Sequence, residues 1–461
     1  MRSWHRRGLV AAFGLGAAMA LTLPIPARAA GKTVVIWWNQ GFYQAEDQAM
    51  KDSVAAWEKA TGNKVELTFS NGSDLPAKVV AALTTGEVPD IVYADTGDFL
   101  LIPQNAWNDK LVDVSDVVDS QKSEYNKAAL EAGRYYDNVT HKRSYYGVPL
   151  KEQALHVEVW KPLVEEAGYK MSDIPKQWDK YFDLFEDVQK KLRAKGKRIY
   201  GLGYSLATKD SDSTYLFNQF LVAYGGGGIV TPDGKLHADD PKVREAAIKA
   251  LDKLTKPYKE GFVPPGAINW GDPDNNNAFY ARQIVMTPNA TISIAVAQME
   301  KTEQYMHEIV TQQLPLGPDG KPVTSLVAVK QAFIPKGAKN VEGAKDFLKS
   351  FIQPKNLDNY LKQARGRWTP VMPSIVKSDP YWLDPSDPHR HVSVSQQIGD
   401  NVPIMPWFMS FNPAYADVNA EQIWGKAEAN VMTGGMTPEK AVDIALGQIK
   451  ADFAKYPVPT E

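Results

Sequence analysis

Hydrophobic positions in the first hundred residues alternate between short β-branched runs and longer stretches with helical spacing. The runs predict buried strands at Thr33–Trp38, Val65–Phe69 and Pro89–Tyr93, with helices at Asp47–Ala60 and Leu75–Thr85 between them. In the first helix Met50, Val54 and Trp57 share one face. Strand–helix–strand units of this length predict an α/β chain with a parallel sheet covered by helices on both faces.

The alternation of predicted strands and helices ends at Tyr146–Leu150, and after it predicted helices outnumber predicted strands. The later helices are predicted at 181–195, 215–224, 242–259, 341–351, 357–363, 416–432 and 438–456, and the later strands at 199–204, 283–287 and 325–334. Thr437 followed by Pro438 and Glu439 is typical of a helix start. No internal repeat or low-complexity linker divides the chain, so any two lobes must be joined by short, structured crossings.

The N-terminus has the pattern of an export signal. Arg6 and Arg7 precede an apolar run from Gly8 to Leu23, and Ala27-Arg28-Ala29 fits a small-x-small cleavage site. The run of about 15 residues is short against the roughly 20 that a spanning helix needs. We therefore expect residues 1–29 to be a signal peptide cleaved after Ala29, with a membrane anchor as the alternative. The Arg pair leaves Sec and twin-arginine export both open.

Composition narrows the class of protein. The 461 residues carry a formal charge of −2, which becomes −6 once residues 1–29 are removed with their four arginines and no acid. A mildly acidic chain without a long basic stretch is a poor candidate for nucleic acid binding. The absence of cysteine excludes disulfides, thiol catalysis, Cys-ligated zinc and a lipid-modified N-terminal Cys.

Four stretches, taken in order, resemble the extracellular solute-binding proteins of carbohydrate ABC importers, the group that includes maltose-binding proteins. They are Val34–Asn39 with the helix to Thr61–Val65; Ala77–Leu83 running into Gly86–Val92; Tyr146–Pro149 with Ala154, Leu155 and Trp160; and Ala223–Gly226 followed by Phe279 and Gln283–Thr287. Each stretch is degenerate alone. Their shared order covers nearly the whole mature chain and is specific for the family, not for a ligand.

This resemblance implies a two-lobed periplasmic binding protein fold of type II. Each lobe is expected to be a sheet flanked by helices, with the ligand cleft at the hinge. Residues 30–149 and 329–374 are expected in lobe 1, and 150–328 and 375–461 in lobe 2. The resemblance also implies a periplasmic, monomeric protein without a cofactor that delivers its ligand to the transmembrane subunits of an importer. Solute bridging both lobes is expected to favour closure.

Polar and aromatic side chains follow the predicted strands of lobe 1, where ligands of open parallel sheets bind. Such side chains suit the hydroxyls and apolar faces of a sugar. The candidates are Asn39, Gln40, Phe42 (or Tyr43), Asn71, Asp95, Thr96, Arg367 and Trp368, together with Gln153 at the predicted crossover between the lobes. Helix capping explains Asn71 equally well, and it is the alternative to a ligand role for Asn39 and Asp95. Lys151 or Arg367 would suit an anionic group, and Glu152 is the neighbouring alternative to Gln153.

Lobe 2 supplies the remaining candidates, which are Tyr215, Asn218, Gly225, Trp270 and Asn289. Tyr215 and Asn218 are three residues apart on one helix face, which also fits simple packing. Gly225 begins a glycine run that more simply ends a helix. Trp270 lies in a polar loop, where stacking on a sugar is a good reason for a Trp.

Two other functions remain open at this stage. A secreted carbohydrate-active enzyme could bring distant carboxylates together, although the chain has no Gly-x-Ser-x-Gly or His-Glu-x-x-His motif. A metal- or anion-binding protein of similar architecture could use His389 and His391, which follow Pro388 and therefore look like an exposed loop. Because the order of the four stretches resembles a family of binding proteins, we expect a binding protein and not an enzyme.

Overall fold

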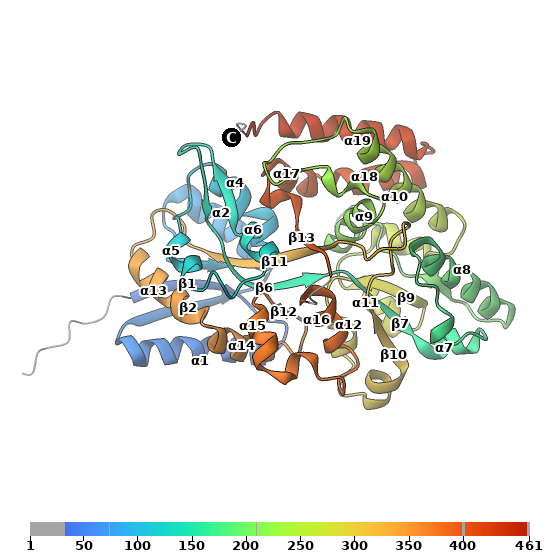
Figure 1. Cartoon of the computed structure of the whole chain (residues 1–461), viewed down its shortest axis with the longest axis horizontal. Helices are drawn as coiled ribbons and strands as arrows, with labels where there is room; N and C mark the ends of the chain where they lie inside the picture. The colour runs from blue at the N-terminus through green and yellow to red at the C-terminus, as the bar shows by residue number, and fades with distance from the viewer. Residues whose placement is uncertain (1–32, 73, 209, 399–401, 459–461) are drawn as a thin grey trace, which may run out of the picture.

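The described residues form two large hydrophobic cores, each with its own sheet, and a smaller third cluster on the other face of the first sheet (Figure 1). The computed structural model describes residues 33–72, 74–208, 210–398 and 402–458. The expected signal peptide and its cleavage site therefore lie outside the described residues. The first core lies on the left of Figure 1 and the second on the right, with the long strands β6 (Val148–Ala154) and β11 (Ser325–Phe333) between them.

The first sheet has seven strands in the order β12-β6-β11-β3-β1-β2, with β13 paired to β11. Its remaining strands are β1 (Thr33–Asn39), β2 (Lys64–Ser70), β3 (Ile91–Tyr93), β12 (Thr369–Pro370) and β13 (Ile404–Pro406). Strands β1, β2 and β3 are parallel, as predicted, and Ile36 pairs with both Leu67 and Ile91. The sheet is nevertheless mixed, because β11 runs antiparallel to β3 and β6.

Helices cover both faces of this sheet because side chains alternate along each strand. Ile91 and Tyr93 pack in the first core with α1 (Gln44–Thr61), α13 (Val341–Phe351) and α14 (Pro354–Lys362). Val92 points the other way, toward α2 (Leu75–Thr85) and α4 (Ile102–Trp107). Met50, Val54 and Trp57 are the buried face of α1 that the sequence predicts.

Further elements complete the first half of the molecule. They are α3 (Gly97–Leu100), α5 (Ser115–Asp119), α6 (Lys127–Ala132), α15 (Pro373–Ser378), α16 (Arg390–Ile398) and the hairpin β4 (Arg134–Asp137) with β5 (Lys142–Tyr145). The sequence pattern did not predict the hairpin. It is a separate two-stranded sheet in which Arg134 pairs with Tyr145.

The second core surrounds a four-stranded sheet of order β10-β7-β9-β8. Its strands are β7 (His156–Trp160), β8 (Tyr200–Leu202), β9 (Ile284–Asn289) and β10 (Ile309–Gln312). Its helices are α7 (Lys161–Glu166), α8 (Trp178–Ala194), α9 (Ser211–Ala223), α10 (Pro241–Lys259), α11 (Asp274–Tyr280), α12 (Ser293–Val296), α17 (Ala414–Ala420), α18 (Ile423–Met432) and α19 (Pro438–Phe453).

One predicted helix is two helices in the structure. The stretch 416–432 divides into α17 and α18 at Gln422, whose φ of 53° is incompatible with a continuous right-handed helix. The start of α19 is as predicted, because the Thr437 hydroxyl accepts a hydrogen bond from the Lys440 N–H.

The chain passes between the cores at positions that differ in part from those expected. β6 stays in the first sheet to Ala154, so the first crossing comes at Leu155 and not at residue 150. The return to the second core is later than residue 375, because Trp382 and Val394 still pack in the first core and Trp407 is in the second. The boundary between the cores is set by which core each apolar side chain is buried in. The sequence after residue 374 does not show this.

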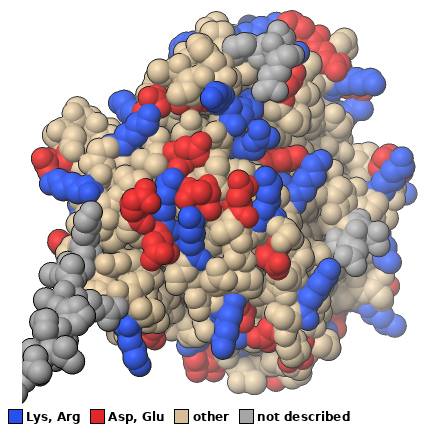
Figure 2. Space-filling view, turned by 60° about the vertical axis from the view of Figure 1, so that its left-hand side comes forward, with Lys and Arg blue, Asp and Glu red and all other residues tan. Residues whose placement is uncertain are grey.

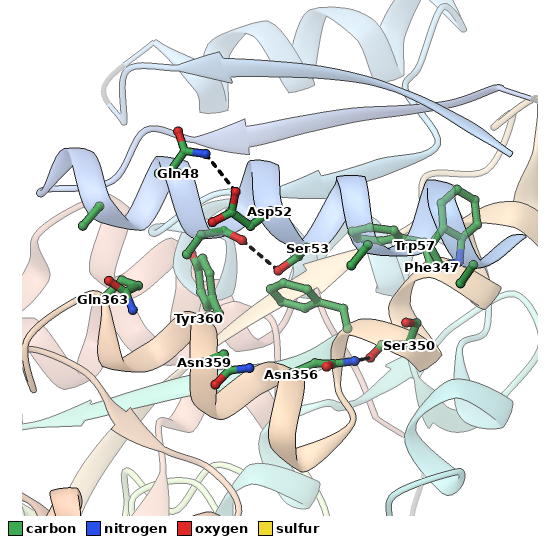
Figure 3. A pocket seen from close by; sticks show the side chains of 15 residues that line it. Gln48, Asp52, Ser53, Trp57, Phe347, Ser350, Asn356, Asn359, Tyr360 and Gln363 are labelled. Carbon is green, nitrogen blue, oxygen red and sulfur yellow. Dashed lines mark hydrogen bonds between the residues drawn. The ribbon is translucent and has the colours of Figure 1, made fainter. Parts of the chain in front are cut away.

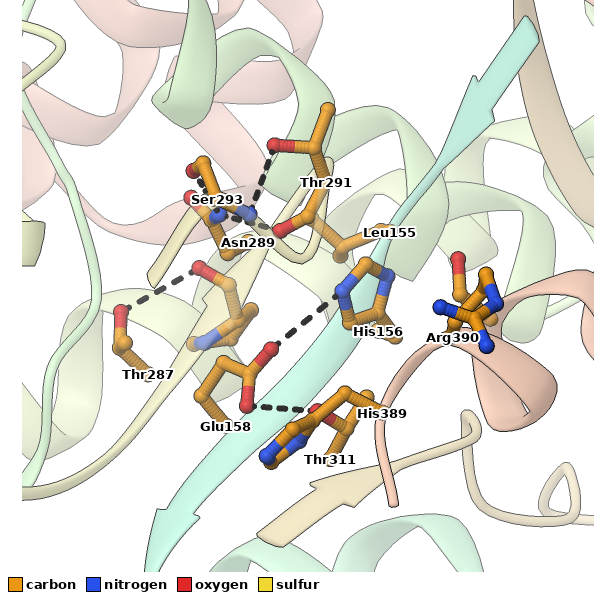
Figure 4. Close-up of polar contacts among 12 residues, drawn as sticks. Leu155, His156, Glu158, Thr287, Asn289, Thr291, Ser293, Thr311, His389 and Arg390 are labelled. Carbon is orange, nitrogen blue, oxygen red and sulfur yellow. Dashed lines mark hydrogen bonds and ion pairs between the residues drawn. The ribbon is translucent and has the colours of Figure 1, made fainter. Parts of the chain in front are cut away.

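A buried polar cluster joins the second sheet to α16 (Figure 4). Glu158 on β7 is fully buried, with His156 Nε2 3.5 Å from its Oε1. The Thr311 hydroxyl lies 2.9 Å from Glu158 Oε2 and 2.7 Å from His389 Nδ1, and His389 Nε2 donates to the Tyr305 carbonyl. The expectation of an exposed loop at His389 is therefore wrong: its side chain is 0% exposed.

We expect Thr311→Val to lower the free energy of unfolding by about 1–3 kcal/mol, because the substitution removes the hydroxyl between Glu158 and His389 and leaves buried polar atoms without partners. Urea unfolding followed by circular dichroism measures this. Thr84→Val is the control, since that hydroxyl is exposed and bonds only its own helix. Equal stability of the two variants would contradict a structural role for the cluster.

The surface has no extended patch of one charge on the face that Figure 2 shows, where Lys and Arg alternate with Asp and Glu. Within the described part of the chain, no helix is long and apolar enough to cross a membrane.

Candidate functional site

The site begins where α1 starts. Tyr43 is the extended N-cap residue of α1, and its backbone N–H donates to Glu46 Oε1 at 3.1 Å. Glu46 is the third residue of the helix and is buried. Glu46 is not among the residues predicted from the sequence, although an acid in the first turn of a helix that follows a strand is a recognisable capping signal.

Lys151 on β6 is the centre of the site. Its side chain is 3% exposed, and its Nζ lies 3.7 Å from Asp95 Oδ1 and 4.0 Å from Glu46 Oε2. Its ammonium also lies over the Trp368 ring, 4.2 Å from the centroid. A buried ammonium needs such partners, because its desolvation is costly. Lys151 therefore joins β6, α1, the end of β3 and the segment after α14.

The pKa values of the group reflect both burial and charge. Burial lowers the pKa of Lys151, although Asp95 and Glu46 oppose that effect. Burial alone would raise the pKa of Asp95, but Lys151, Arg367 and the Tyr93 hydroxyl hold it below its usual range. The Tyr93 hydroxyl donates directly to Asp95 Oδ1. Asp95 is consequently an ionised carboxylate at neutral pH, and its side chain remains 27% exposed.

Arg367 lies beside this group and is flanked by aromatic rings. Its guanidinium is 4.9 Å from the Phe42 ring centroid and 4.6 Å from that of Trp368. Its Nη1 lies 3.9 Å from Glu46 Oε1, and its side chain is 16% exposed. Phe42 is 59% exposed, whereas Trp368 is 2% exposed and covered by Lys151. Phe42, not Trp368, therefore offers the open ring on this side.

Four buried polar atoms of this region have no hydrogen-bond partner among the described residues: Tyr43 Oη, Thr96 Oγ1, Arg367 Nε and Trp368 Nε1. Burial raises the pKa of Tyr43 to about 12, so its hydroxyl keeps its proton. A buried polar group without a partner costs about 1–3 kcal/mol. Such a concentration of unpaired donors and acceptors calls for an explanation beyond folding, and a ligand is the common one.

Both edges of the group reach the second core. Gln153 Nε2 donates to the Tyr215 hydroxyl of α9 at 2.9 Å, and the Tyr215 ring packs on Phe99 and Trp407. Arg365 Nη1 lies 3.7 Å from Glu300 Oε1. These contacts place Lys151, Glu46, Asp95, Arg367 and Trp368, which we call the Lys151–Arg367 group, at the boundary between the two cores.

Other predicted residues lie near the same boundary. Asn39 ends β1, and its side chain is within hydrogen-bond distance of Asp95 (Nδ2 to Oδ2, 3.5 Å). Gln40 and Asn71 are exposed next to it, with Gln40 N donating to the Ser70 carbonyl. Trp270 is half-buried against the second core.

Three predicted residues of lobe 2 are occupied by the packing of the fold instead. Asn218 is fully buried, where its Nδ2 donates to the Thr214 carbonyl and its Oδ1 accepts from Tyr415. Asn289 is buried and donates to the Thr291 carbonyl and the Ser293 hydroxyl. Gly225 has a φ of 95° in the turn after α9, a conformation that favours glycine. Helix packing and turn geometry account for all three.

Glu152 and Gln153 point to different surroundings, as neighbours in a strand do. Gln153 reaches α9, whereas Glu152 is fully buried with both carboxyl oxygens 3.1 Å from Asn126 Nδ2. Burial raises the pKa of Glu152 to about 8, although the Asn126 hydrogen bond opposes this. Glu152 is therefore protonated in the folded chain at neutral pH.

The free energy of unfolding should fall as the pH rises from about 4.5 to about 8, because over that interval the unfolded chain loses the Glu152 proton and the folded chain keeps it. We expect this group to contribute a loss on the order of 3–5 kcal/mol by pH 8.5, and Glu152→Gln to remove it. Urea unfolding at pH 5 and pH 8.5 measures the difference, with the exposed Glu66→Gln as control. Parallel pH profiles for the wild type and Glu152→Gln would contradict the assignment.

No three His, Cys, Asp or Glu side chains among the described residues are grouped as metal ligands would be. The buried His389 and the partly buried His391 each bond to backbone carbonyls, of Tyr305 and Asp387 respectively. The chemistry that the Lys151–Arg367 group offers is hydrogen bonding from ionised and neutral side chains, together with aromatic contact.

Known proteins share this architecture. Solved structures with 20% identity include a solute-binding protein from Thermotoga lettingae bound with α-D-tagatose, which covers 92% of this chain and 100% of its own with a TM-score of 0.70. A cyclic α-maltosyl-1,6-maltose binding protein from Arthrobacter globiformis covers 92% of this chain and 99% of its own, also with a TM-score of 0.70. At these identities the likeness shows the fold.

Sequence comparison identifies the family. A probable ABC transporter-binding protein of Deinococcus radiodurans is 24% identical over 326 residues, which are 69% of each chain. The family model of bacterial extracellular solute-binding proteins matches residues 52–389, most of the chain. The protein belongs to the bacterial extracellular solute-binding proteins.

Proposed function

We propose that this protein captures a neutral sugar or sugar derivative between its two cores and delivers it to an ABC importer. The observation that carries the proposal is the set of four unpaired buried polar atoms around Lys151 and Arg367, at the boundary of the cores. Donors and acceptors of several geometries beside an exposed aromatic ring suit a polyhydroxylated ligand.

The pairing of positive and negative side chains in the group favours a neutral ligand over an anionic one. The buried or mostly buried cations in and next to the group are Lys151, Lys330 and Arg367, and Glu46, Asp95 and Asp98 face them; Arg365 at the edge of the group pairs with Glu300. Lys330 Nζ lies 3.1 Å from Asp98 Oδ1, so none of the three cations lacks a carboxylate within 4 Å. An added anion would leave one charge uncompensated in a desolvated site. Oligosaccharides, monosaccharides, polyols and glycerol-linked sugars all remain within this class.

From the first core we assign the ligand contacts to Asn39, Gln40, Phe42, Tyr43, Asp95, Thr96 and Arg367. From the second core we assign them to Tyr215 and Trp270, with Gln153 at the crossing. Trp368 contributes its Nε1 rather than its ring face. The proposal also includes export directed by residues 1–29 and cleavage after Ala29. The mature protein would then be a monomer in the periplasm, where it can deliver its solute to the membrane subunits of the importer.

Thermal-shift screening of the mature protein tests this function. We expect at least one neutral saccharide or polyol to raise the melting temperature in a concentration-dependent manner, as ligands of the folded state do, and acidic sugars of the same ring to be weaker. Stabilisation by acidic sugars alone would overturn the neutral assignment. If the saccharide were cleaved during incubation, an enzyme would be the correct function.

A further inference from the structure

A long groove separates α1 from α14 on the surface of the first half of the molecule (Figure 3). Its volume is about 690 Å³, within the range of about 300–1,000 Å³ that ligand sites occupy. One wall is the face of α1 from Ala45 to Ala60, and the other consists of α13 and α14. α1 contacts both α13 and α14, so the groove runs along the outer side of their interface.

The lining combines small side chains with polar ones. The α1 wall of the groove is lined mainly by the small side chains of Ala45, Ala49, Ala56 and Ala60. The floor of the groove consists of the buried rings of Trp57, Phe351 and Tyr360. Figure 3 shows Gln48 and Asp52 on α1 and Asn356, Asn359 and Gln363 on the facing wall.

Several of these polar groups have capacity for a ligand. The exposed amides of Asn359 and Gln363 make no hydrogen bond within the described chain. Gln48 Nε2 donates to Asp52 Oδ1 at 2.8 Å, and Asn356 Nδ2 donates to the Ser350 carbonyl at 2.8 Å, which leaves their amide oxygens free to accept. Planar amides and a carboxylate along two edges of a groove match the alternating hydroxyls of a sugar chain.

The groove also leads to the Lys151–Arg367 group. Its first residue on α1, Ala45, is two positions from Tyr43, and its last on the other wall, Gln363, is four positions from Arg367. From Ala45 to Ala60 the helix extends about 22 Å, which is longer than any single sugar unit. Tyr360 belongs to both regions, because its ring lies on the groove floor and 5.7 Å from the Lys151 ammonium.

We propose that the α1–α14 groove is an extended subsite that holds the outer units of a linear oligosaccharide whose end lies between the two cores. This assignment rests on the proposed function and specifies it, because it selects a chain-like ligand over a monosaccharide. The boundary site would bind one end of the chain, and the groove would add affinity with each further unit until its length is filled.

Titration calorimetry with two defined series tests the assignment: linear α-1,4-glucans and linear β-1,3-glucans of one to seven glucose units. For one series we expect the affinity of the wild type to rise at least tenfold between the dimer and the longest chain. Ala56→Trp, which fills the groove, should reduce the longest chain to the affinity of the dimer. Ala55→Trp is the matched control, since Ala55 is exposed on the same helix outside the groove.

Asn359→Ala provides a second variant that does not alter packing, and we expect it to lower the affinity for long chains three- to tenfold while the dimer is unaffected. Binding of the dimer without any gain from chain length, or a gain that survives Ala56→Trp, would overturn the subsite. Failure of every saccharide to bind the wild type would instead overturn the proposed function, and the subsite with it. If Ala56→Trp binds every chain normally but no longer supports uptake by cells, the groove is a protein-docking face and the saccharide assignment is wrong.

Discussion

Lys151→Met should lower the free energy of unfolding by about 3–5 kcal/mol, the largest loss we expect from a single side chain near the site. The substitution preserves most of the volume but leaves the carboxylates of Glu46 and Asp95 without the ammonium that lies 3.7–4.0 Å from them. Removing one partner from a buried ion pair costs this much because the remaining charge stays desolvated. Urea unfolding of the purified variant measures the loss.

Two further variants separate charge from packing. Lys151→Met combined with Asp95→Asn should recover part of the lost stability, since it removes one uncompensated charge along with the cation. Lys339→Met should cost less than about 1 kcal/mol, because Lys339 and its partner Glu87 are both about 80% exposed. If Lys151→Met matched Lys339→Met, the buried ion pair would not be a stabilising part of the site.

Arg367→Met should weaken saccharide binding by about 10- to 150-fold, with a much smaller effect on folding. Its unpaired Nε and its position between Phe42 and Trp368 place a charged donor where a sugar hydroxyl can accept from it. A hydrogen bond to a charged group contributes about 1.5–3 kcal/mol, which is 10- to 150-fold in Kd. Titration calorimetry with the best saccharide from the thermal-shift screen measures the change.

Arg244→Met is the matched control for that experiment, because Arg244 pairs with Asp443 on the exposed surface. Arg367→Lys should bind with intermediate affinity, since an ammonium keeps the charge but not the planar fork. An Arg367→Met protein that melts like the wild type and binds with unchanged affinity would remove Arg367 from the ligand site.

Local patterns predicted most of the first half of the fold. β1, α1, α2 and α13 begin and end within a few residues of the positions that hydrophobic spacing predicted, because each element buries one regular face. The exceptions have physical causes that no short window contains. In the second half Gln422 adopts a left-handed conformation that divides a predicted helix, and in the first sheet β11 pairs antiparallel with β3, where Ala332 lies opposite Tyr93, 239 residues earlier in the chain.

The Lys151–Arg367 group was predictable only in part, because its residues come from four distant segments. Asn39, Asp95 and Arg367 were identifiable as polar residues at strand ends or in loops. The pairing of Lys151 with Glu46 and Asp95 depends on how tertiary packing brings β6, the start of α1 and the end of β3 together. Asn218 shows how packing can use a candidate residue: it lies on a helix face that contacts α17 through Tyr415, which is the packing alternative that the sequence left open.

The proposed function requires one solute to contact both cores at once. Hydrogen–deuterium exchange of the mature protein, with and without a saturating saccharide from the screen, tests it most directly. We predict slower exchange in residues 40–46 and 365–368 of the first core and also in residues 269–276 beside the second. Protection confined to one core, or no protection at a saccharide concentration that calorimetry shows to be saturating, would contradict capture between the cores.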